Sequence, residues 1–213
     1  MSDLLFSTEL PKPVLETIET LKKAGHSAFL VGGCVRDLLR GQTPSDFDVA
    51  TSAKPEQVKP LFSRVIPTGI DHGTVTVVLR GQHIEVTTFR AEAEYVDGRR
   101  PSKVLFHDDI DADLSRRDFT MNAIAYDPVK GQVVDLFEGQ KDIKDILIRA
   151  VGNPSERFNE DALRMMRAVR LAAQLGFRIE EKTADAIFAH RELLRDIAVE
   201  RIRDEWEKML STE

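Results

Sequence analysis

Two aspartates separated by one residue, in Asp46-Phe47-Asp48, have the type and spacing to bind a metal ion. In an extended segment side chains alternate between two faces, so both carboxylates project from one face, about 6–7 Å apart. Two such charges repel unless a cation lies between them, and hard oxygen ligands suit Mg²⁺. Glu85, in a second strand-like segment, is the best placed third carboxylate, and two ions held in this way could activate a hydroxyl and stabilise a pyrophosphate leaving group. Because such triplets are common, the alternative is an ordinary solvated strand face.

A glycine pair lies upstream of these aspartates, in Gly32-Gly33 followed by Arg36. Glycines between a strand and a helix let backbone N–H groups approach a phosphate, and an arginine there can reach the same anion. Taken alone, the pair could equally be a tight turn. Together with the aspartates on the next strand, it predicts a nucleotidyltransferase palm, with a triphosphate on the turn and metal ions on the carboxylates.

These residues need a scaffold of strands and helices, which the hydrophobic pattern supplies. Alternating or apolar runs predict strands at residues 27–31, 46–51, 74–79, 83–89, 123–127, 132–135 and 147–150. Helical spacing and stop signals predict helices at residues 11–23, 35–40, 55–62, 113–117, 139–145, 159–175, 182–190 and 199–210. No β-rich run follows residue 154, so we expect an α+β head at residues 1–152 and an all-helical neck at 153–213.

Composition excludes several classes of protein. The chain has 213 residues, of which 42% are hydrophobic, and 12 glycines and 9 prolines, which argues against a disordered or collagen-like chain. No apolar run approaches the roughly 20 residues of a membrane span, and the first ten residues are unlike a secretion signal. The single Cys34 suits a reducing compartment, so we expect a cytoplasmic protein without membrane partners. The net charge of −6 gives no overall sign of a nucleic-acid partner.

The order of the motifs carries a family resemblance. Five segments contribute to it: residues 30–37 (LVGGCVRD), 45–48 (SDFD), 116–123 (RRDFTMNA), 135–142 (DLFEGQKD) and 160–167 (EDALRMMR). They resemble the class II nucleotidyltransferases, which share the DNA polymerase beta-like palm. Glu138 stands where glycine is more common in the third motif. The resemblance implies this palm followed by a helical neck, with Asp46 and Asp48 as metal ligands and Glu85 beside them.

The family has two branches, the tRNA CCA-adding enzymes and the bacterial poly(A) polymerases, and residues 84–90 and 123–127 resemble the CCA-adding branch more closely. That branch implies transfer of C and A from CTP and ATP to the 3′ end of tRNA, with two Mg²⁺ ions and release of pyrophosphate. The alternatives are an A-adding enzyme or poly(A) polymerase, a non-catalytic RNA- or nucleotide-binding module, and a fragment with little activity.

The resemblance implies that Asp161 and Arg164 read the nucleobase. By spacing alone, Glu160, Arg164 and Arg167 share one helix face, which could also be a solvated, salt-bridged face. Base chemistry supports reading, because C and A both present an amino donor beside a ring-nitrogen acceptor. A carboxylate and a guanidinium match that pattern, whereas U and G would leave buried polar groups unpaired.

The remaining nucleotide contacts implied by the resemblance are Arg117, Arg167 and Arg170, with the glycine turn Gly32-Gly33 and Arg36 on the phosphates. Arginines supply forked donors to phosphate oxygens. Asn122 could contact the sugar or simply cap a helix.

Two features bear on the extent of the activity. Residues 90–111 are polar and charged, and in the family a flexible loop here is associated with adding the terminal A; a merely disordered surface loop is the alternative. Full-length members of the family extend through further helical domains that hold the tRNA. We therefore expect a head and neck alone, with weak affinity for whole tRNA because it makes fewer phosphate contacts.

Overall fold

The computed structural model describes residues 10–91, 105–106 and 109–211. Its helices are α1 (Lys12–Lys23), α2 (Gly33–Leu39), α3 (Pro55–Val58), α4 (Ile110–Ser115), α5 (Gly139–Lys144), α6 (Pro154–Glu160), α7 (Leu163–Leu175), α8 (Glu181–His190) and α9 (Val199–Leu210). Its strands are β1 (Ala28–Val31), β2 (Asp48–Thr51), β3 (Val65–Gly69), β4 (Thr74–Leu79), β5 (Gln82–Thr88), β6 (Arg90–Ala91), β7 (Leu105–Phe106), β8 (Ile124–Asp127), β9 (Gln132–Asp135), β10 (Leu147–Ile148) and β11 (Arg178–Ile179).

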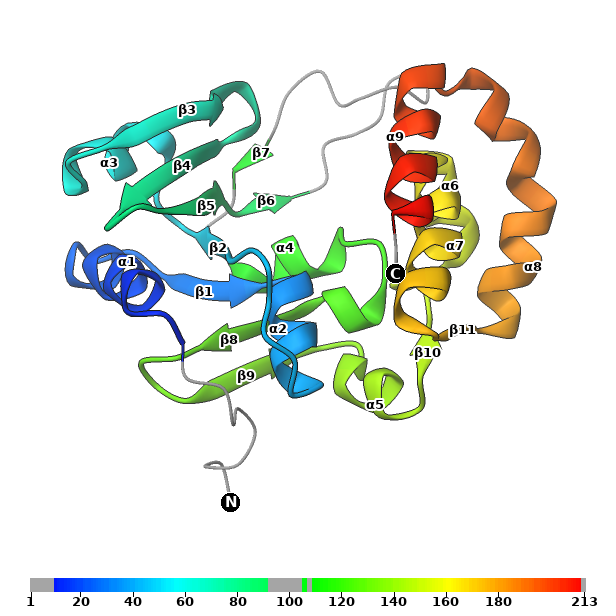
Figure 1. Cartoon of the computed structure of the whole chain (residues 1–213), viewed down its shortest axis with the longest axis horizontal. Coiled ribbons are helices and arrows are strands. Elements are labelled where there is room, and N and C mark those ends of the chain that lie inside the picture. Colours follow the sequence, from blue (N-terminus) through cyan, green and yellow to red (C-terminus); the bar gives the residue numbers. More distant parts are fainter. Residues whose placement is uncertain (1–9, 92–104, 107–108, 212–213) are drawn as a thin grey trace.

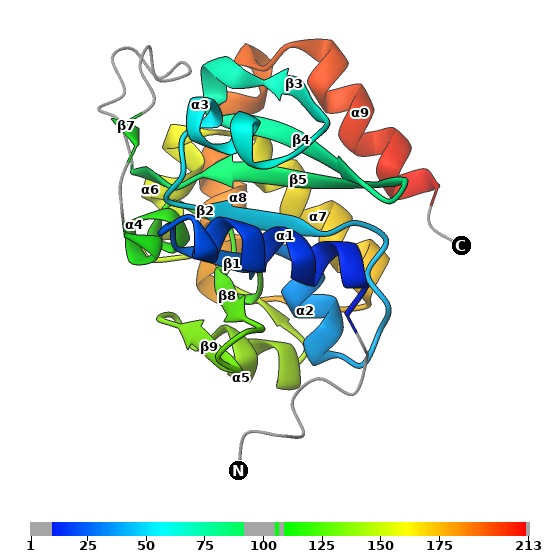
Figure 2. The same ribbon diagram turned by 90° about the vertical axis from the view of Figure 1, so that its left-hand side faces the viewer.

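A mixed seven-stranded sheet forms the centre of the head, in the order β3-β4-β5-β2-β1-β8-β9 within the described part of the chain (Figures 1 and 2). The strand β2 runs antiparallel to β1 and parallel to β5. In this register Asp48 lies opposite both Val31, the last residue of β1, and Glu85 of β5. The strand ends thus bring the glycine turn and two carboxylates to the same place.

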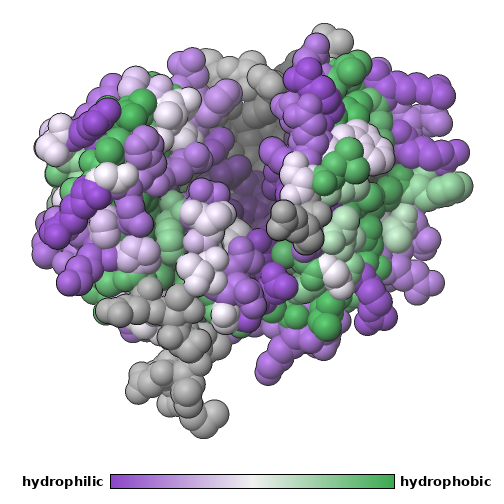
Figure 3. Space-filling view, in the orientation of Figure 1, coloured by the Kyte–Doolittle hydropathy of each residue, from purple (hydrophilic) through white to green (hydrophobic). Residues whose placement is uncertain are grey.

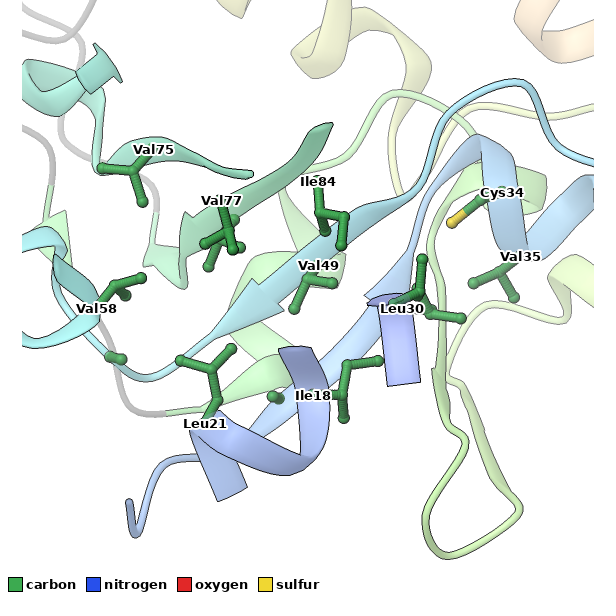
Figure 4. Close-up of a cluster of buried hydrophobic side chains, with 14 of the residues drawn as sticks. Ile18, Leu21, Leu30, Cys34, Val35, Val49, Val58, Val75, Val77 and Ile84 are labelled. Atoms are coloured by element: carbon green, nitrogen blue, oxygen red, sulfur yellow. The ribbon is translucent and has the colours of Figure 1, made fainter. Parts of the chain in front are cut away.

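The two faces of the sheet bury different side chains, because successive residues of a strand point to opposite sides. Leu30 and Val49 belong to the large cluster under α1 and α2, shown in Figure 4. Their neighbours Val31 and Ala50 join the cluster on the other face, which α4 covers with Ile110 and Leu114. By the same alternation, Asp48 and Glu85 share the α4 side of the sheet.

The helices α6 to α9 stand beside one edge of the head (Figure 1). A two-stranded parallel ladder links the two parts, because β10 pairs with β11. One buried cluster also crosses the junction, with Phe119 and Met121 packed on Ala168, Leu171 and Phe177. The predicted boundary near residue 152 therefore falls inside a continuous hydrophobic core, and the division into two domains stays a prediction.

The predicted elements agree with the structure in most places, but no predicted strand covers β3, and other segments differ as well. The predicted strand 46–51 begins only at Asp48, so the alternation argument does not apply to Asp46, which lies in a bend. The predicted helix 159–175 is two helices, since Asp161 has an extended backbone at φ −148° and ψ 102°. The short strand β11 also interrupts the predicted all-helical part. Most of the predicted loop 90–111 lies outside the described residues.

In the residues that the structure describes, no helix has the length and apolar composition needed to cross a membrane.

Candidate active site

A polar cleft of about 480 Å³ lies between the head and the helices α6 to α9 (Figure 3). Nine of the predicted site residues line it: Gly32, Gly33, Asp48, Glu85, Arg117, Asn122, Asp161, Arg164 and Arg167. Segments far apart in the sequence thus meet in one place. Asp46, Arg36 and Arg170 are not among the residues that line the cleft.

Gly32 ends β1 in a conformation that favours glycine, with φ +75°. A Cβ atom at this position would lie 3.1 Å from Nη1 of Arg117 and 3.7 Å from Oδ2 of Asp48. The missing side chain therefore lets a guanidinium and a carboxylate approach the backbone of the turn. Such a concave, polar surface suits the oxygens of a phosphate group.

Arg36, predicted to contact a phosphate, is hydrogen-bonded to two protein side chains in the structure. Its guanidinium forms a two-point hydrogen bond with Asp37 (both 2.9 Å) and donates through Nη1 to Oδ1 of Asn122 at 3.0 Å. All of these acceptors belong to the protein, so in this structure Arg36 orients Asn122. A direct contact between Arg36 and a nucleotide stays a prediction.

The carboxylates of Asp48 and Glu85 lie on adjacent strands in register. Burial raises the pKa of Asp48, and the nearby charges of Glu85 and Asp46 raise it further, to about 6, although Arg117 partly offsets them. This electrostatic frustration is what a divalent cation would relieve. The donor set therefore fits a hard cation bound by one or two carboxylates and completed by water or phosphate oxygens.

Asp46 is exposed in the bend before β2, with Oδ2 accepting from the Ser45 hydroxyl at 3.0 Å. Within the described residues no group of three His, Cys, Asp or Glu side chains is arranged to hold a metal ion. The charge of Asp46 still acts on Asp48. Its role as a metal ligand stays a prediction.

Asp118 connects the head to the helix α7. Its Oδ2 accepts from Nε of Arg167 at 2.8 Å, while Oδ1 accepts from the backbone N–H of Phe119 and, at 3.4 Å, from Nδ2 of Asn122. Burial alone would raise the pKa of Asp118, but Arg167 and these hydrogen bonds outweigh it and hold the pKa below its ordinary value. Asn122 and Arg167 are thus fixed by one buried carboxylate.

Asp113, also buried, holds a pair of arginines at the cleft wall. Arg116 donates to its Oδ1 at 2.7 Å and Arg117 to its Oδ2 at 2.9 Å. Burial by itself would raise the pKa of Asp113, yet the two guanidinium groups keep it below the usual range. The backbone N–H of Arg90 also donates to Oδ1, at 3.2 Å.

The two residues predicted to read the base have separate partners. Asp161 lies between α6 and α7 and accepts from the backbone N–H of Leu163 at 3.1 Å, and Arg201 of α9 donates to its Oδ2 at 3.2 Å. Arg164 donates to Glu160 at 2.6 Å and to the Arg116 carbonyl at 3.0 Å. Although the helix breaks at Asp161, Glu160 and Arg164 still contact each other at a spacing of four residues, as the predicted salt-bridged face would have them do.

Arg170 points toward α9 and not into the cleft lining. It donates through Nε to Glu205 at 2.6 Å and through Nη1 to Gln174 at 2.7 Å. These contacts join α7 to α9. Contact with a nucleotide by Arg170 stays a prediction.

Sequence reasoning missed four charged residues that line the cleft: Arg90, Arg116, Asp118 and Arg201. Arg116 and Asp118 stand inside the RRDFTMNA motif, so the motif itself was a signal for them. Arg201 lies 40 residues beyond its partner Asp161, and no local pattern connects the two.

The fold and this cleft define the class: a nucleotidyltransferase palm joined to a helical neck. A domain family described as the poly A polymerase head domain matches residues 28–149, and one described as a probable RNA and SrmB-binding site of polymerase A matches residues 176–213. The first match covers more than half of the chain, and the chain therefore belongs to the poly A polymerase head domain family.

Its relatives confirm the resemblance to the class II CCA-adding enzymes. The chain is 57% identical to a CCA-adding enzyme of Lactobacillus helveticus over 92% of its own length and 48% of the relative's. The structure of the Bacillus stearothermophilus CCA-adding enzyme in complex with CTP matches with a TM-score of 0.87 and 46% identity, over 94% of this chain and 49% of that one. A Thermotoga maritima CCA-adding enzyme complexed with tRNA matches with a TM-score of 0.79 and 28% identity, over 100% and 50%. The chain thus spans about half the length of the relatives it matches.

Proposed function

We propose that this chain carries the catalytic part of a template-independent RNA nucleotidyltransferase that adds C and A from CTP and ATP to the 3′ end of tRNA. The observation that supports this most is the cleft, which places the glycine turn and Asp48 opposite Asp161 and Arg164. Similar enzymes are known in complex with CTP and with tRNA. In the reaction the RNA 3′-oxygen bonds to the α-phosphorus, the α–β bridging bond breaks, and pyrophosphate leaves.

Asp48 and Asp46 would hold two Mg²⁺ ions, with Glu85 as the third carboxylate beside them. The raised pKa of Asp48 supports this assignment, because it reports negative charge in excess at this point. Bound Mg²⁺ supplies charge stabilisation for the attacking hydroxyl and for the leaving pyrophosphate. The chain's own contribution is to hold the triphosphate on the Gly32-Gly33 turn, near Arg117.

The base would be selected by Asp161 and Arg164, which can accept from the amino group and donate to the ring nitrogen of C or A. Their present partners, Arg201 and Glu160, satisfy both side chains within the protein. A nucleobase would take over part of these contacts, and Arg167, fixed by Asp118, adds positive charge on the same side of the cleft. Asn122 would contact the sugar.

An extension assay tests this function. A short acceptor minihelix without its CCA end is incubated with the chain and Mg²⁺. Each of the four NTPs is added in a separate reaction, and the products are resolved on a gel. We expect C from CTP, A from ATP after C, and no extension with UTP or GTP. Incorporation of A but never C would favour an A-adding enzyme or poly(A) polymerase.

The matched control is Asp48→Ala, which removes a metal ligand. Unchanged incorporation by this variant would rule out the metal mechanism. A folded wild-type chain that extends no acceptor would instead identify a binding fragment that needs the rest of its longer relatives.

A further inference from the structure

Arg90 differs from the other arginines of the cleft in the part of the chain that the structure describes. Six arginines line it: Arg90, Arg116, Arg117, Arg164, Arg167 and Arg201. Five donate to protein carboxylates, namely Asp113 (twice), Glu160, Asp118 and Asp161. None of the described residues accepts a hydrogen bond from the guanidinium of Arg90, whose Nε atom, like that of Arg117, is buried without a partner.

The backbone of Arg90 is nevertheless firmly placed. Its N–H donates to Oδ1 of Asp113 at 3.2 Å, and the residue begins β6, which pairs with β7 through the register of Arg90 with Phe106. The main chain thus fixes where the side chain starts, and the guanidinium reaches the cleft close to Glu85 and Thr87. An arginine held in this way and left unpaired has five unused donors.

Two arginines and two carboxylates act on the charge of Arg90. Asp113 is already paired with Arg116 and Arg117, and Glu85 is the other carboxylate whose charge acts on Arg90. Burial lowers the pKa of Arg90, and Arg116 and Arg117 lower it further, to about 10, against the opposing effect of Asp113. A group with this pKa is still protonated at neutral pH. Of the three guanidinium groups, only that of Arg90 forms no ion pair with a described carboxylate, so it is the one available to an anion.

We propose that Arg90 is a phosphate-contacting residue of this cleft, with its planar fork of donors bound to a phosphate group of the substrate. The proposal rests on the proposed function for the presence of such a group, which belongs to the incoming nucleoside triphosphate or to the RNA near its 3′ end. Phosphate fits better than a nucleobase, because two further guanidinium groups stand beside the free one and paired donors match phosphate oxygens.

The test compares Arg90→Gln and Arg90→Lys with Arg195→Gln, a matched loss of charge at a side chain that is 82% exposed outside the cleft. Calorimetry measures binding of inorganic tripolyphosphate and of CTP to each protein. Fluorescence anisotropy measures binding of an acceptor minihelix at several salt concentrations. Thermal unfolding is recorded for all of them.

If the contact is to the triphosphate, Arg90→Gln should weaken tripolyphosphate and CTP binding by about tenfold to a hundredfold, with minihelix binding unchanged. If it is to the RNA, minihelix binding should weaken and the slope of log K against log salt should fall by about 1, with tripolyphosphate unaffected. Arg90→Lys should retain part of the affinity, because it keeps the charge but loses the fork. Arg195→Gln should match the wild type.

Melting temperature separates a substrate contact from a structural role. The guanidinium has no partner to lose among the described residues, so Arg90→Gln should melt no lower than the wild type. A large drop in its melting temperature, or unchanged binding of all three probes, would overturn the proposal. A wild type that binds no probe would overturn it together with the proposed function. Binding that depends on Arg90 in a chain that extends no acceptor would support the proposal and count against the function alone.

Discussion

At the scale of single residues, the carboxylates of the site differ in whether they form ion pairs with arginines. Asp113 and Asp118 are saturated by arginines, which holds their pKa values below the ordinary range once burial is outweighed. In the described part of the chain no arginine donates a hydrogen bond to Asp48, and burial together with the charge of Glu85 raises its pKa to about 6, against the opposing charge of Arg117. Asp113 and Asp118 thus fix Arg116, Arg117 and Arg167, whereas Asp48 forms no such pair with a described arginine.

Replacing Asp48 by Asn should separate stability from activity. The change removes repulsion with Glu85, so we expect the metal-free variant to melt higher, by about 2–4 °C for each kcal/mol regained. Incorporation of nucleotide should fall by about a thousandfold, since metal stabilisation is worth several kcal/mol. Mg²⁺ should raise the melting temperature of the wild type and not that of Asp48→Asn. Equal responses of both proteins to Mg²⁺ would contradict this assignment.

Asp118→Asn should destabilise the protein in a pH-dependent way. The lost ion pair with Arg167 should lower the free energy of unfolding by about 1.5–3 kcal/mol near neutral pH. Because the folded-state pKa of Asp118 is lowered, its contribution is present above the ordinary value of about 3.9 and is lost as pH falls through the lower folded-state pKa. Urea unfolding at a series of pH values should show the two curves converging in acid. The exposed Asp185→Asn on α8 should track the wild type at every pH.

The sequence predicted which residue types form the site better than it predicted which side chains contact one another. The glycine turn, the carboxylate of Asp48 and its neighbour Glu85 follow from residue type and strand alternation, and the structure brings them together. The sequence does not show which arginine is left without an ion pair. Nothing in the local sequence distinguishes Arg90 from Arg116, and only the structure shows that the guanidinium of Arg116 donates to Asp113. Arg201 was missed for the same reason, since its contact with Asp161 depends on how α9 packs.

At the scale of elements, short irregular segments set the positions of functional side chains. The break at Asp161 divides a stretch whose pattern is helical, and the carboxylate of Asp161 accepts from the backbone N–H of Leu163 just after the break. A periodicity argument does not detect this, since Glu160 and Arg164 keep helical spacing across the break. The same holds for β11, which has two residues and is too short to give a pattern, whereas β10 lies within the predicted strand 147–150.

The segment before α5 offers a paired test of backbone geometry. Glu138 has φ +58°, so Glu138→Gly should stabilise the fold by about 0.5–1 kcal/mol, while Glu138→Ala should have little effect. Gly139 has no room for a side chain, because a Cβ atom would lie 2.2 Å from the carbonyl oxygen of Thr120. We therefore expect Gly139→Ala to cost about 2–3 kcal/mol or more in urea unfolding. A neutral Gly139→Ala would mean that α5 moves freely against residues 120–124.

At the scale of the whole molecule, head and neck share a core across the predicted boundary near residue 152. Phe177 of the neck packs with Phe119 and Met121 of the head and is 7% exposed. The cleft exists only because these parts are held together. Most of the elements could be predicted in order along the sequence, although β3 and β11 were missed. The contact between the two parts depends on residues more than 40 positions apart.

A single truncation should reveal whether the two parts unfold as one. Phe177→Ala should lower the free energy of unfolding by about 3–5 kcal/mol. Fluorescence of Trp206, on α9, and far-ultraviolet circular dichroism should give coincident transitions in both proteins. The exposed Phe188→Ala should change stability by less than about 1 kcal/mol. Transitions at separate urea concentrations would show that the neck unfolds independently.

The position of β9 in the sheet also orders events during synthesis. The chain has completed every strand of the seven-stranded sheet by Asp135, before α7 and Phe177 leave the ribosome. The head can pair its strands early, while the apolar surface around Phe119 and Met121 stays exposed to solvent until the neck packs on it. Pairing of β10 with β11 closes that interval. We therefore expect the nascent chain to be most exposed to aggregation, and most in need of a chaperone, while the ribosome synthesises the residues between β10 and β11.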